Sequence, residues 1–149
     1  MISQSALSLA VLVSSLATTT YDYTVLNTPQ APQPRITQEM RDMSTTEIKE
    51  LIKEVWNEDS YKGIMVASCE SQLQQFDKDG TVLRGRVNPD DIGIFQINSF
   101  YHEEDYLKMN IDVFTPIGNI MYAKFIYDRS GLAPWVHSKH CWSKLLTSS

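Results

Sequence analysis

The chain has 149 residues, a hydrophobic fraction of 42% and a formal net charge of −5 at pH 7. This length and hydrophobic content fit one folded domain with its own core. The sequence shows no basic stripe of the kind that nucleic-acid-binding proteins carry, and its acidic balance disfavours charge-driven binding to anionic membranes.

The start of the chain is expected to precede the folded domain. Residues 1–20 contain the apolar run Ala6–Ala17 and no charged side chain. The run is shorter than the roughly 20 residues that span a membrane. It is typical of the hydrophobic region of a secretory signal peptide, although the usual basic start is missing, and an apolar tail is the alternative. Residues 21–43 contain three prolines without periodicity, which indicates a linker.

Helical signals begin where the folded domain, expected over residues 44–143, starts. The sequence STTE at Ser44–Glu47 fits a capping box, and apolar residues follow at helical spacing up to Trp56. The polar stretch Asn57–Ser60 should end this helix. A second helix is expected over about Tyr61–Leu73.

Turn signals dominate the segment from Phe76 to Ile97. Asp79-Gly80 is a hairpin signal next to short apolar or β-branched pieces at Thr81–Leu83 and Val87. Asn88–Asp90 is a second turn signal. A small antiparallel sheet is expected here.

The C-terminal part is predicted to be helical again. Thr115-Pro116 fits a helix start and Gly131 fits its end. Apolar residues lie nearly all round the helix between them, which predicts a buried central helix. Short helical turns follow, and residues 144–149 are expected to form a tail. The predicted fold class is therefore α+β, mostly α, with a small antiparallel β-sheet beside a helical lobe.

Cys69 and Cys141 are the only cysteines in the chain. In an oxidising compartment they would form one disulfide, whereas in a cytosol they would remain thiols. The signal-peptide pattern favours the disulfide. A zinc site formed by both cysteines with His137 and His140 does not have a recognised ligand spacing. Neither a metal nor a cofactor is expected.

Two carboxyl groups stand out by their contrasting surroundings. Glu70 follows the apolar run VASC, and Asp91 lies in a polar, turn-rich segment. Desolvation favours the protonated form of a carboxyl group, which can then act as a general acid. Two carboxyls in different environments are the usual equipment for cleaving glycosidic bonds. By themselves, however, a helical glutamate and an aspartate in a turn are usually solvated surface residues.

Three motifs together resemble the lysozyme-like superfamily. They are Glu70-Ser71, the sequence DIGIFQINS at Asp91–Ser99 and the helix start PIGNI at Pro116–Ile120. They are similar to the small lytic transglycosylases of secretion and conjugation systems and to chicken-type lysozymes. The resemblance covers about Ile48–Trp142 and implies a lysozyme-like fold for the domain. An A-Y-N-A-G segment of the transglycosylase type and most lysozyme cysteines are absent.

The resemblance also implies roles for individual residues. Glu70 would be the general acid, and Asp91 would be the second carboxylate of a hydrolase. Five residues would line the glycan cleft: Ser71, Gln96, Asn98, Pro134 and Trp135. The backbone N–H of Asn98 and the carbonyl of Pro134 would hold an acetamido group. Trp135 would pack beside the acid and raise its pKa.

The implied reaction is cleavage of the β-1,4 bond between N-acetylmuramic acid and N-acetylglucosamine in peptidoglycan. A lytic transglycosylase is favoured because DIGIFQINS with P-x-x-N-I is most similar to that group. A lysozyme-type hydrolase that uses Glu70 and Asp91 is the first alternative. The second alternative is a non-catalytic cell-wall-binding protein.

The expected setting follows from the same features. We expect an exported monomer, in the periplasm, the cell envelope or the medium, that acts on peptidoglycan glycan strands. No nucleic-acid partner is expected, and no membrane contact beyond the signal segment.

Overall fold

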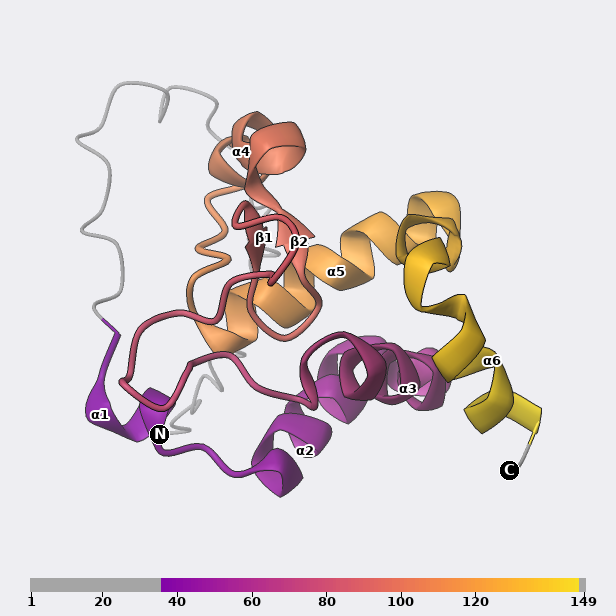
Figure 1. The fold of residues 1–149 in the computed structure, drawn as a ribbon. Coiled ribbons are helices and arrows are strands. Elements are labelled where there is room, and N and C mark those ends of the chain that lie inside the picture. Colours follow the sequence, from indigo (N-terminus) through magenta and orange to yellow (C-terminus); the bar gives the residue numbers. More distant parts are fainter. Residues whose placement is uncertain (1–35, 148–149) are drawn as a thin grey trace, which may run out of the picture. The chain divides into compact units, whose positions relative to one another are not determined.

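The computed structural model of the protein describes residues 36–147. The predicted signal peptide or tail of residues 1–20 and most of the predicted linker lie outside the described residues. The helices are α1 (Gln38–Arg41), α2 (Thr45–Trp56), α3 (Ser60–Ser71), α4 (Ser99–Lys108), α5 (Pro116–Ser130) and α6 (Lys139–Thr147) (Figure 1). Two 3₁₀ segments, η2 (Asn57–Asp59) and η3 (Ala133–Ser138), and two strands, β1 (Asp91–Ile92) and β2 (Ile97–Asn98), complete this part of the chain.

The fold class is α+β and mostly α, as the sequence predicts. Helical structure also occurs on both sides of the 44–143 range. The short helix α1 lies within the segment expected to be linker, and α6 continues to Thr147 in the expected tail. Among residues 36–147, no helix has both the length and the apolar character that crossing a bilayer requires.

The predicted capping box at the start of α2 is confirmed. Ser44 Oγ accepts the Glu47 N–H at 3.3 Å, and Glu47 Oε2 accepts the Ser44 N–H at 2.7 Å. The helix buries Ile48, Ile52 and Trp56 and ends at the expected polar stretch. The helical spacing of the apolar residues in the sequence therefore predicted correctly which face of α2 is buried.

Helix α3 ends earlier than the predicted boundary at Leu73. Its last residue is Ser71, and Gln72 and Leu73 adopt positive φ values of 59° and 65°. This left-handed pair turns the chain away from the helix axis immediately after Glu70 and Ser71. The prediction was wrong here because neither residue is a glycine, which would have signalled such a turn.

The small antiparallel sheet is confirmed, but it does not form where the apolar pieces predicted it. The strands pair in the register Asp91↔Asn98 and Ile92↔Ile97. In the predicted piece Thr81–Leu83, Val82 forms one isolated backbone bridge with Phe76, and the neighbouring Arg84 forms another with Ile92. Val87, the other predicted strand residue, is 99% exposed. The sheet forms at Ile92 and Ile97 because these two side chains are buried in the core.

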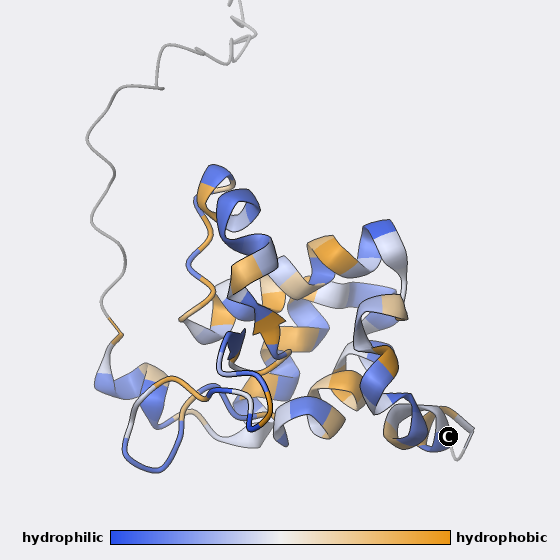
Figure 2. Ribbon diagram, turned by 45° about the horizontal axis from the view of Figure 1, so that its top comes forward, coloured by the Kyte–Doolittle hydropathy of each residue, from blue (hydrophilic) through white to orange (hydrophobic). Residues whose placement is uncertain are grey.

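Helix α5 begins and ends as predicted but is not buried all round. Thr115 Oγ1 accepts the Gly118 N–H, and the helix stops at Gly131 with φ 59°. Ile117 and Met121 are 38% and 45% exposed, so burial is confined to one broad face. By contrast α4 is mostly hydrophilic and buries only Tyr106 (Figure 2).

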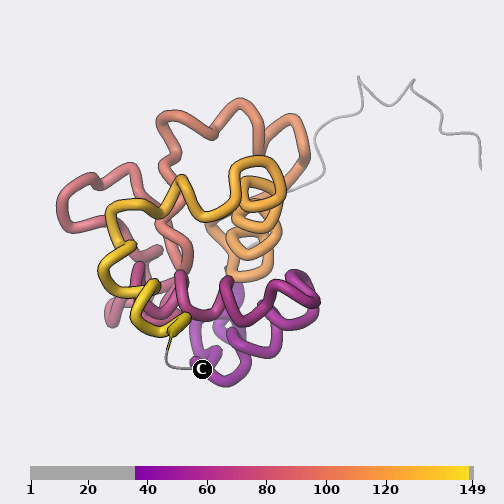
Figure 3. Tube along the Cα trace, turned by 90° about the vertical axis from the view of Figure 1, so that its right-hand side faces the viewer, coloured from indigo at the N-terminus to yellow at the C-terminus, as the bar shows by residue number. Residues whose placement is uncertain are grey.

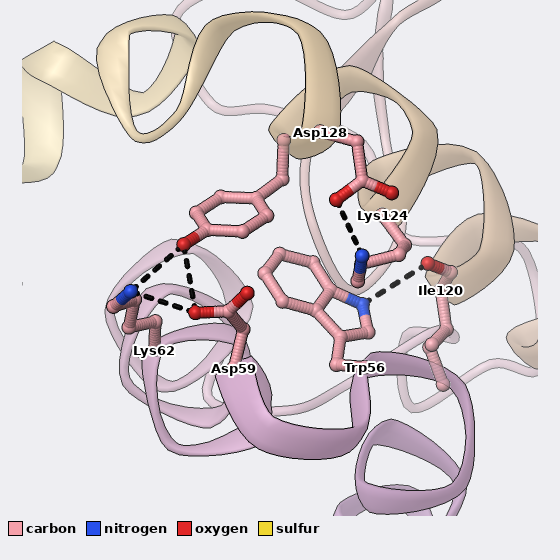
Figure 4. A network of polar contacts seen from close by, with 7 residues as sticks. Trp56, Asp59, Lys62, Ile120, Lys124 and Asp128 are labelled. Atoms are coloured by element: carbon pink, nitrogen blue, oxygen red, sulfur yellow. Dashed lines mark hydrogen bonds and ion pairs between the residues drawn. The ribbon is translucent and has the colours of Figure 1, made fainter.

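The core is centred on Trp56. Its ring stacks on Phe95 with a centroid separation of 5.1 Å and lies 4.9 Å from Tyr127 and 6.4 Å from Trp135. Its indole N–H donates to the carbonyl of Ile120 in α5 at 3.3 Å (Figure 4). Aromatic residues from four parts of the chain thus share one contact cluster.

A polar network beside Trp56 fastens the start of α3 to α5. Lys62 Nζ donates to Asp59 Oδ1 at 2.7 Å and to the Tyr127 hydroxyl at 2.9 Å (Figure 4). The Tyr127 hydroxyl in turn donates to Asp59 at 3.0 Å. The network fixes the helix that carries Glu70 against the central helix α5.

Two buried amide side chains hold the loop between the strands. Asn119 of α5 accepts the Phe95 N–H at 2.9 Å and donates to the carbonyls of Ile92 and Val113 at 2.9 and 3.1 Å. Gln75 accepts the Ile94 N–H at 3.1 Å and donates to Val113 at 3.2 Å. The loop backbone thereby finds partners that its short strands do not supply.

Glycine is required at position 93 in this loop. Its φ is +66°, and a Cβ there would lie 2.3 Å from Gln75 Oε1. The approach of the loop to the buried amide therefore depends on the absence of a side chain.

Replacement of Asn119 by leucine is expected to destabilise the protein strongly. The change keeps a similar volume but leaves the Phe95 N–H without its partner and removes one donor from each of the Ile92 and Val113 carbonyls, of which Val113 keeps Gln75. An unsatisfied buried group costs about 1–3 kcal/mol and each lost hydrogen bond about 0.5–1.5 kcal/mol, so a loss of about 2–5 kcal/mol is expected in urea unfolding. Met121→Leu, at an exposed position of the same helix, should change stability by less than about 0.5 kcal/mol. A loss below about 1 kcal/mol for Asn119→Leu would contradict this role.

Candidate active site

A groove passes between the end of α3, the loop before β1 and η3. It consists of two adjoining cavities of about 370 and 670 Å³. Both are lined by Glu70, Val87, Asp91 and Gln96. We call the smaller one the arginine cavity, because Arg84 and Arg86 line it, and the larger one the tryptophan cavity, because it is lined by Trp135.

A further cavity, of about 720 Å³, lies elsewhere on the described residues. It is lined by α1, the start of α2 and the segment 73–81. Neither Glu70 nor Asp91 lines it. The groove, rather than this cavity, therefore contains the paired carboxyls that the sequence singled out.

Glu70 lies in the last turn of α3 and is half-buried. Burial raises the pKa of its carboxyl above the ordinary value, and the charge of Asp91 raises it further. The hydrogen bond from Ser138 and the proximity of His137 act in the opposite direction on this pKa. A position at the C-terminal end of a helix also disfavours a negative charge. These surroundings favour the protonated acid, as the apolar sequence context predicted.

The hydroxyl of Ser138 provides Glu70 with a partner in both protonation states. Ser138 Oγ lies 2.5 Å from Glu70 Oε1 and 3.1 Å from the carbonyl oxygen of Trp135. A hydroxyl has one proton, so it donates to one of these acceptors at a time. It donates to ionised Glu70; when Glu70 is protonated, the acid donates to Oγ and the hydroxyl proton turns to Trp135.

Trp135 is buried and lines the same cavity as Glu70. Its indole N–H donates to the carbonyl of Phe95 at 2.9 Å, so the side chain is anchored in the core. Its carbonyl accepts the Trp142 indole N–H at 2.9 Å as well as the Ser138 hydroxyl. The contact that links Trp135 with Glu70 thus passes through Ser138, which sequence reasoning missed because a single serine forms no motif.

Asp91 has a more polar environment than Glu70. It lies in β1, and its Oδ1 accepts a hydrogen bond from Asn98 Nδ2 at 2.7 Å. The Asn98 Oδ1 caps α4 by accepting the Tyr101 N–H at 3.3 Å. The Asn98 side chain is therefore engaged through both its amide nitrogen and its amide oxygen, and it orients Asp91.

The other predicted cleft residues differ in what they present to the groove. Ser71 lines the arginine cavity, but its hydroxyl donates to the Ile94 carbonyl at 2.7 Å and so joins α3 to the interstrand loop. Gln96 lines both cavities with φ 49° and donates to the Gly93 carbonyl at 2.9 Å. Pro134 is exposed and lines the tryptophan cavity.

The predicted disulfide between Cys69 and Cys141 is confirmed. The two Cα atoms are 5.9 Å apart, and the bridge joins α3 to α6. In Figure 3 the yellow C-terminal segment, which includes α6, lies beside the purple segment that includes α3. The bond uses both thiols, which removes them from the zinc set considered with His137 and His140. It also holds η3 and Ser138 close to the end of α3, next to Glu70.

Several groove residues were not identified from the sequence. Val87, His102, Tyr101 and His137 line the tryptophan cavity, and the two arginines line the other. Tyr101 and His102 lie two and three positions after Ser99, the last residue of the DIGIFQINS motif, and this closeness was the available signal. His102 contacts the Tyr122 hydroxyl through Nδ1 at 3.2 Å, and burial lowers the pKa of its imidazole.

Comparison of the chain with protein-family models, curated proteins and solved structures finds no match. The resemblance to the lysozyme-like superfamily therefore rests on the three motifs named above. The geometry of the groove is the independent basis for a functional proposal.

Removal of the Ser138 hydroxyl is expected to raise the pKa of Glu70 further. The hydroxyl stabilises the ionised carboxylate, so Ser138→Ala should shift the Glu70 titration to higher pH. The shift is measured from the ¹³C chemical shift of the Glu70 carboxyl across a pH titration. Ser143→Ala in α6 is the matched control and should leave the titration unchanged. An unchanged or lower pKa in Ser138→Ala would contradict the hydrogen bond as described.

Proposed function

We propose that this protein cleaves peptidoglycan glycan strands at the β-1,4 bond between N-acetylmuramic acid and N-acetylglucosamine. It would act as a lytic transglycosylase with Glu70 as general acid and base. The observation that carries the proposal is the half-buried Glu70 at the junction of two cavities, with its pKa raised by burial. A raised pKa keeps a proton available for the glycosidic oxygen nearer to neutral pH.

The reaction needs one group that gives a proton and later takes one. Protonated Glu70 donates to the glycosidic oxygen as the bond from that oxygen to the muramyl C1 breaks. The muramyl 6-hydroxyl then attacks C1, and its proton passes to the Glu70 carboxylate. The product is a 1,6-anhydro sugar, and Glu70 returns to its starting state. Ser138 supports this cycle because it is a hydrogen-bond partner of both the acid and the carboxylate.

The two cavities accommodate the strand on either side of the cleaved bond. The resemblance assigns the Asn98 backbone and the Pro134 carbonyl to an acetamido group, and both residues line the tryptophan cavity. We therefore assign the muramyl side of the bond to the tryptophan cavity and the leaving-group side to the arginine cavity. Glu70, which lines both, would lie at the bond itself.

A lysozyme-type hydrolase is the second candidate. It is favoured by the presence of Asp91 beside Glu70 in both cavities. In that reaction Asp91 would act as nucleophile or as stabiliser of the positive charge, and water would complete the cleavage. Asn98 would then orient the reacting carboxylate. A wall-binding protein without turnover is the remaining alternative.

Export to an oxidising compartment belongs to the same proposal. The disulfide supports it, because such bonds persist outside the reducing cytosol. The signal peptide proposed for residues 1–20 would provide the route. Peptidoglycan is also located outside the cytosol, so the proposed substrate and compartment agree.

Replacement of Glu70 by glutamine is expected to abolish cleavage without unfolding the protein. General acid–base help is worth about 10²–10⁴-fold, so release of fragments from purified peptidoglycan should fall by at least about 100-fold. The melting temperature at pH 7 should be equal or higher, because glutamine avoids ionising a half-buried carboxyl. This gain should vanish as the pH falls below the ordinary glutamate range near 4.5, where the wild-type carboxyl is protonated.

The matched control for that variant is Glu54→Gln, at an exposed position of α2. It should retain wild-type activity. A Glu70→Gln protein with more than a tenth of wild-type activity would remove Glu70 from the reaction.

Replacement of Asp91 by asparagine distinguishes the two reactions. With a transglycosylase, the loss should be mild and mass spectrometry should find anhydromuramyl ends. A hydrolase would lose most of its activity, and its wild-type products would carry reducing ends. Wild-type protein that releases no product of either kind, while still sedimenting with peptidoglycan, would support the binding alternative.

A further inference from the structure

Among the described residues, lysine or arginine side chains line one side of the groove only. Among the described lining residues, the sole lysine or arginine side chains are Arg84 and Arg86, and both line the arginine cavity. The tryptophan cavity is lined by two histidines, His102 and His137, and by no lysine or arginine of the described residues. In a chain of net charge −5, this placement makes the two sides of the groove electrostatically different.

The arginine segment is held in a defined position relative to Asp91. The backbone of Arg84 forms an isolated antiparallel β-bridge with Ile92 of β1. The Gly85 N–H donates to the Asp91 carbonyl at 3.0 Å. A Cβ at Gly85 would lie 2.4 Å from the carbonyl oxygen of Asn88, so only glycine fits between the two arginines. The arginines are thus carried by backbone that is bonded to the strand bearing the second carboxyl.

The two guanidinium groups differ in how they are engaged. Arg84 Nη1 donates to the Pro89 carbonyl at 3.2 Å, and its guanidinium lies 5.6 Å from the centre of the Phe114 ring. Arg86 is exposed, and no ion pair or side-chain hydrogen bond joins it to another of residues 36–147. Arg86 therefore has its full set of donors available for a ligand, whereas Arg84 has part of its set.

A ligand that fits this cavity has to tolerate Glu70 and Asp91 as well. An anionic group beside two carboxyls alone would be repelled, but two guanidinium groups offset that repulsion. Arginine presents parallel N–H donors that match the two oxygens of a carboxylate. The chemistry of the cavity therefore suits a substrate segment that carries a carboxylate better than a neutral segment.

We propose that the arginine cavity is a subsite for a substrate carboxylate on the leaving-group side of the cleaved bond, with Arg86 as its principal contact. This inference rests on the proposed function, because it assumes a glycan strand in the groove. The sugar next to the cleaved bond on this side is the neutral N-acetylglucosamine, so the carboxylate would come from the muramyl residue that follows it. Its source would be the lactyl group where the stem peptide is absent, or a carboxyl of the stem peptide where it is present. The subsite would select peptidoglycan over neutral polymers of N-acetylglucosamine.

Three forms of the same soluble strand test the subsite. The first keeps its stem peptides, the second has them removed by an amidase so that the lactyl carboxylate is free, and the third has that carboxylate converted to its methylamide. Arg86→Gln is compared with wild type, with Arg86→Lys, which keeps the charge, and with Lys78→Gln, which removes one exposed charge outside the groove. The measured quantities are kcat and KM at low and high salt.

For Arg86→Gln we expect kcat/KM on a carboxylate-bearing strand to fall by about 3- to 10-fold, mainly through KM. Added salt should reduce this difference, because it screens an exposed ion pair. Arg86→Lys should recover part of the loss, and Lys78→Gln should match wild type. On the methylamide strand, Arg86→Gln and wild type should be equal.

The pattern over the three strands identifies the carboxylate. A loss only on the amidase-treated strand assigns the lactyl carboxylate, and a loss only on the stem-bearing strand assigns a carboxyl of the peptide. A loss on both charged strands, with none on the methylamide strand, supports a subsite that accepts either carboxylate. An equal loss on all three strands, or no loss on any, overturns the subsite while leaving the proposed cleavage intact.

A binding measurement separates the subsite from the proposed cleavage. The affinity of the Glu70→Gln protein for the three strands is measured by calorimetry with Arg86 intact and with Arg86→Gln. A charge-dependent loss of affinity supports the subsite even where wild type cleaves no strand, in which case the cleavage proposal alone fails. Equal affinities in both proteins overturn the subsite.

Discussion

The arrangement of the groove depends on the buried amide of Asn119. Its three hydrogen bonds reach the Phe95 N–H and the carbonyls of Ile92 and Val113, so one side chain of α5 fixes both the interstrand loop and β1. The strands contain two residues each and cannot satisfy the loop by themselves. The buried amide replaces the missing strand pairing, and the position of Asp91 follows from it because Asp91 is in the same strand.

A second set of constraints brings a distant segment to Glu70. The disulfide joins the residue before Glu70 to α6, and Trp135 is anchored by its indole bond to the Phe95 carbonyl. Both contacts act on the segment that contains Ser138. Glu70 is thereby half-buried and keeps one hydrogen-bond partner, which raises its pKa and still allows it to ionise. The two carboxyls therefore have unlike environments: Glu70 lies beside the core, and Asp91 lies on a strand and accepts a hydrogen bond from Asn98.

The groove is also asymmetric in charge, and the two proposals use different parts of it. In these proposals, cleavage would depend on Glu70 at the junction of the cavities, and substrate choice would depend on Arg86 in one cavity. The arginines occur in a loop that is bonded to the strand of Asp91. A change in that loop would therefore alter which glycan strands the protein binds, with little effect on Glu70. The proposed reaction and the proposed selectivity would thus be carried by separate segments of the domain.

The sequence by itself determined the features that depend on neighbouring residues. The Ser44–Glu47 capping box, the Thr115 cap and the fold class follow from contacts within three or four positions. The disulfide was predictable from the two cysteines of the chain together with the signal-peptide pattern, which favoured an oxidising compartment. Only the tertiary structure placed Ser138 on Glu70, since 68 positions separate them and their contact requires the packing of η3 against α3. The strands form at Ile92 and Ile97, and not at the predicted pieces Thr81–Leu83 and Val87, for the same reason. Burial of these two side chains in the shared core outweighed local strand preference.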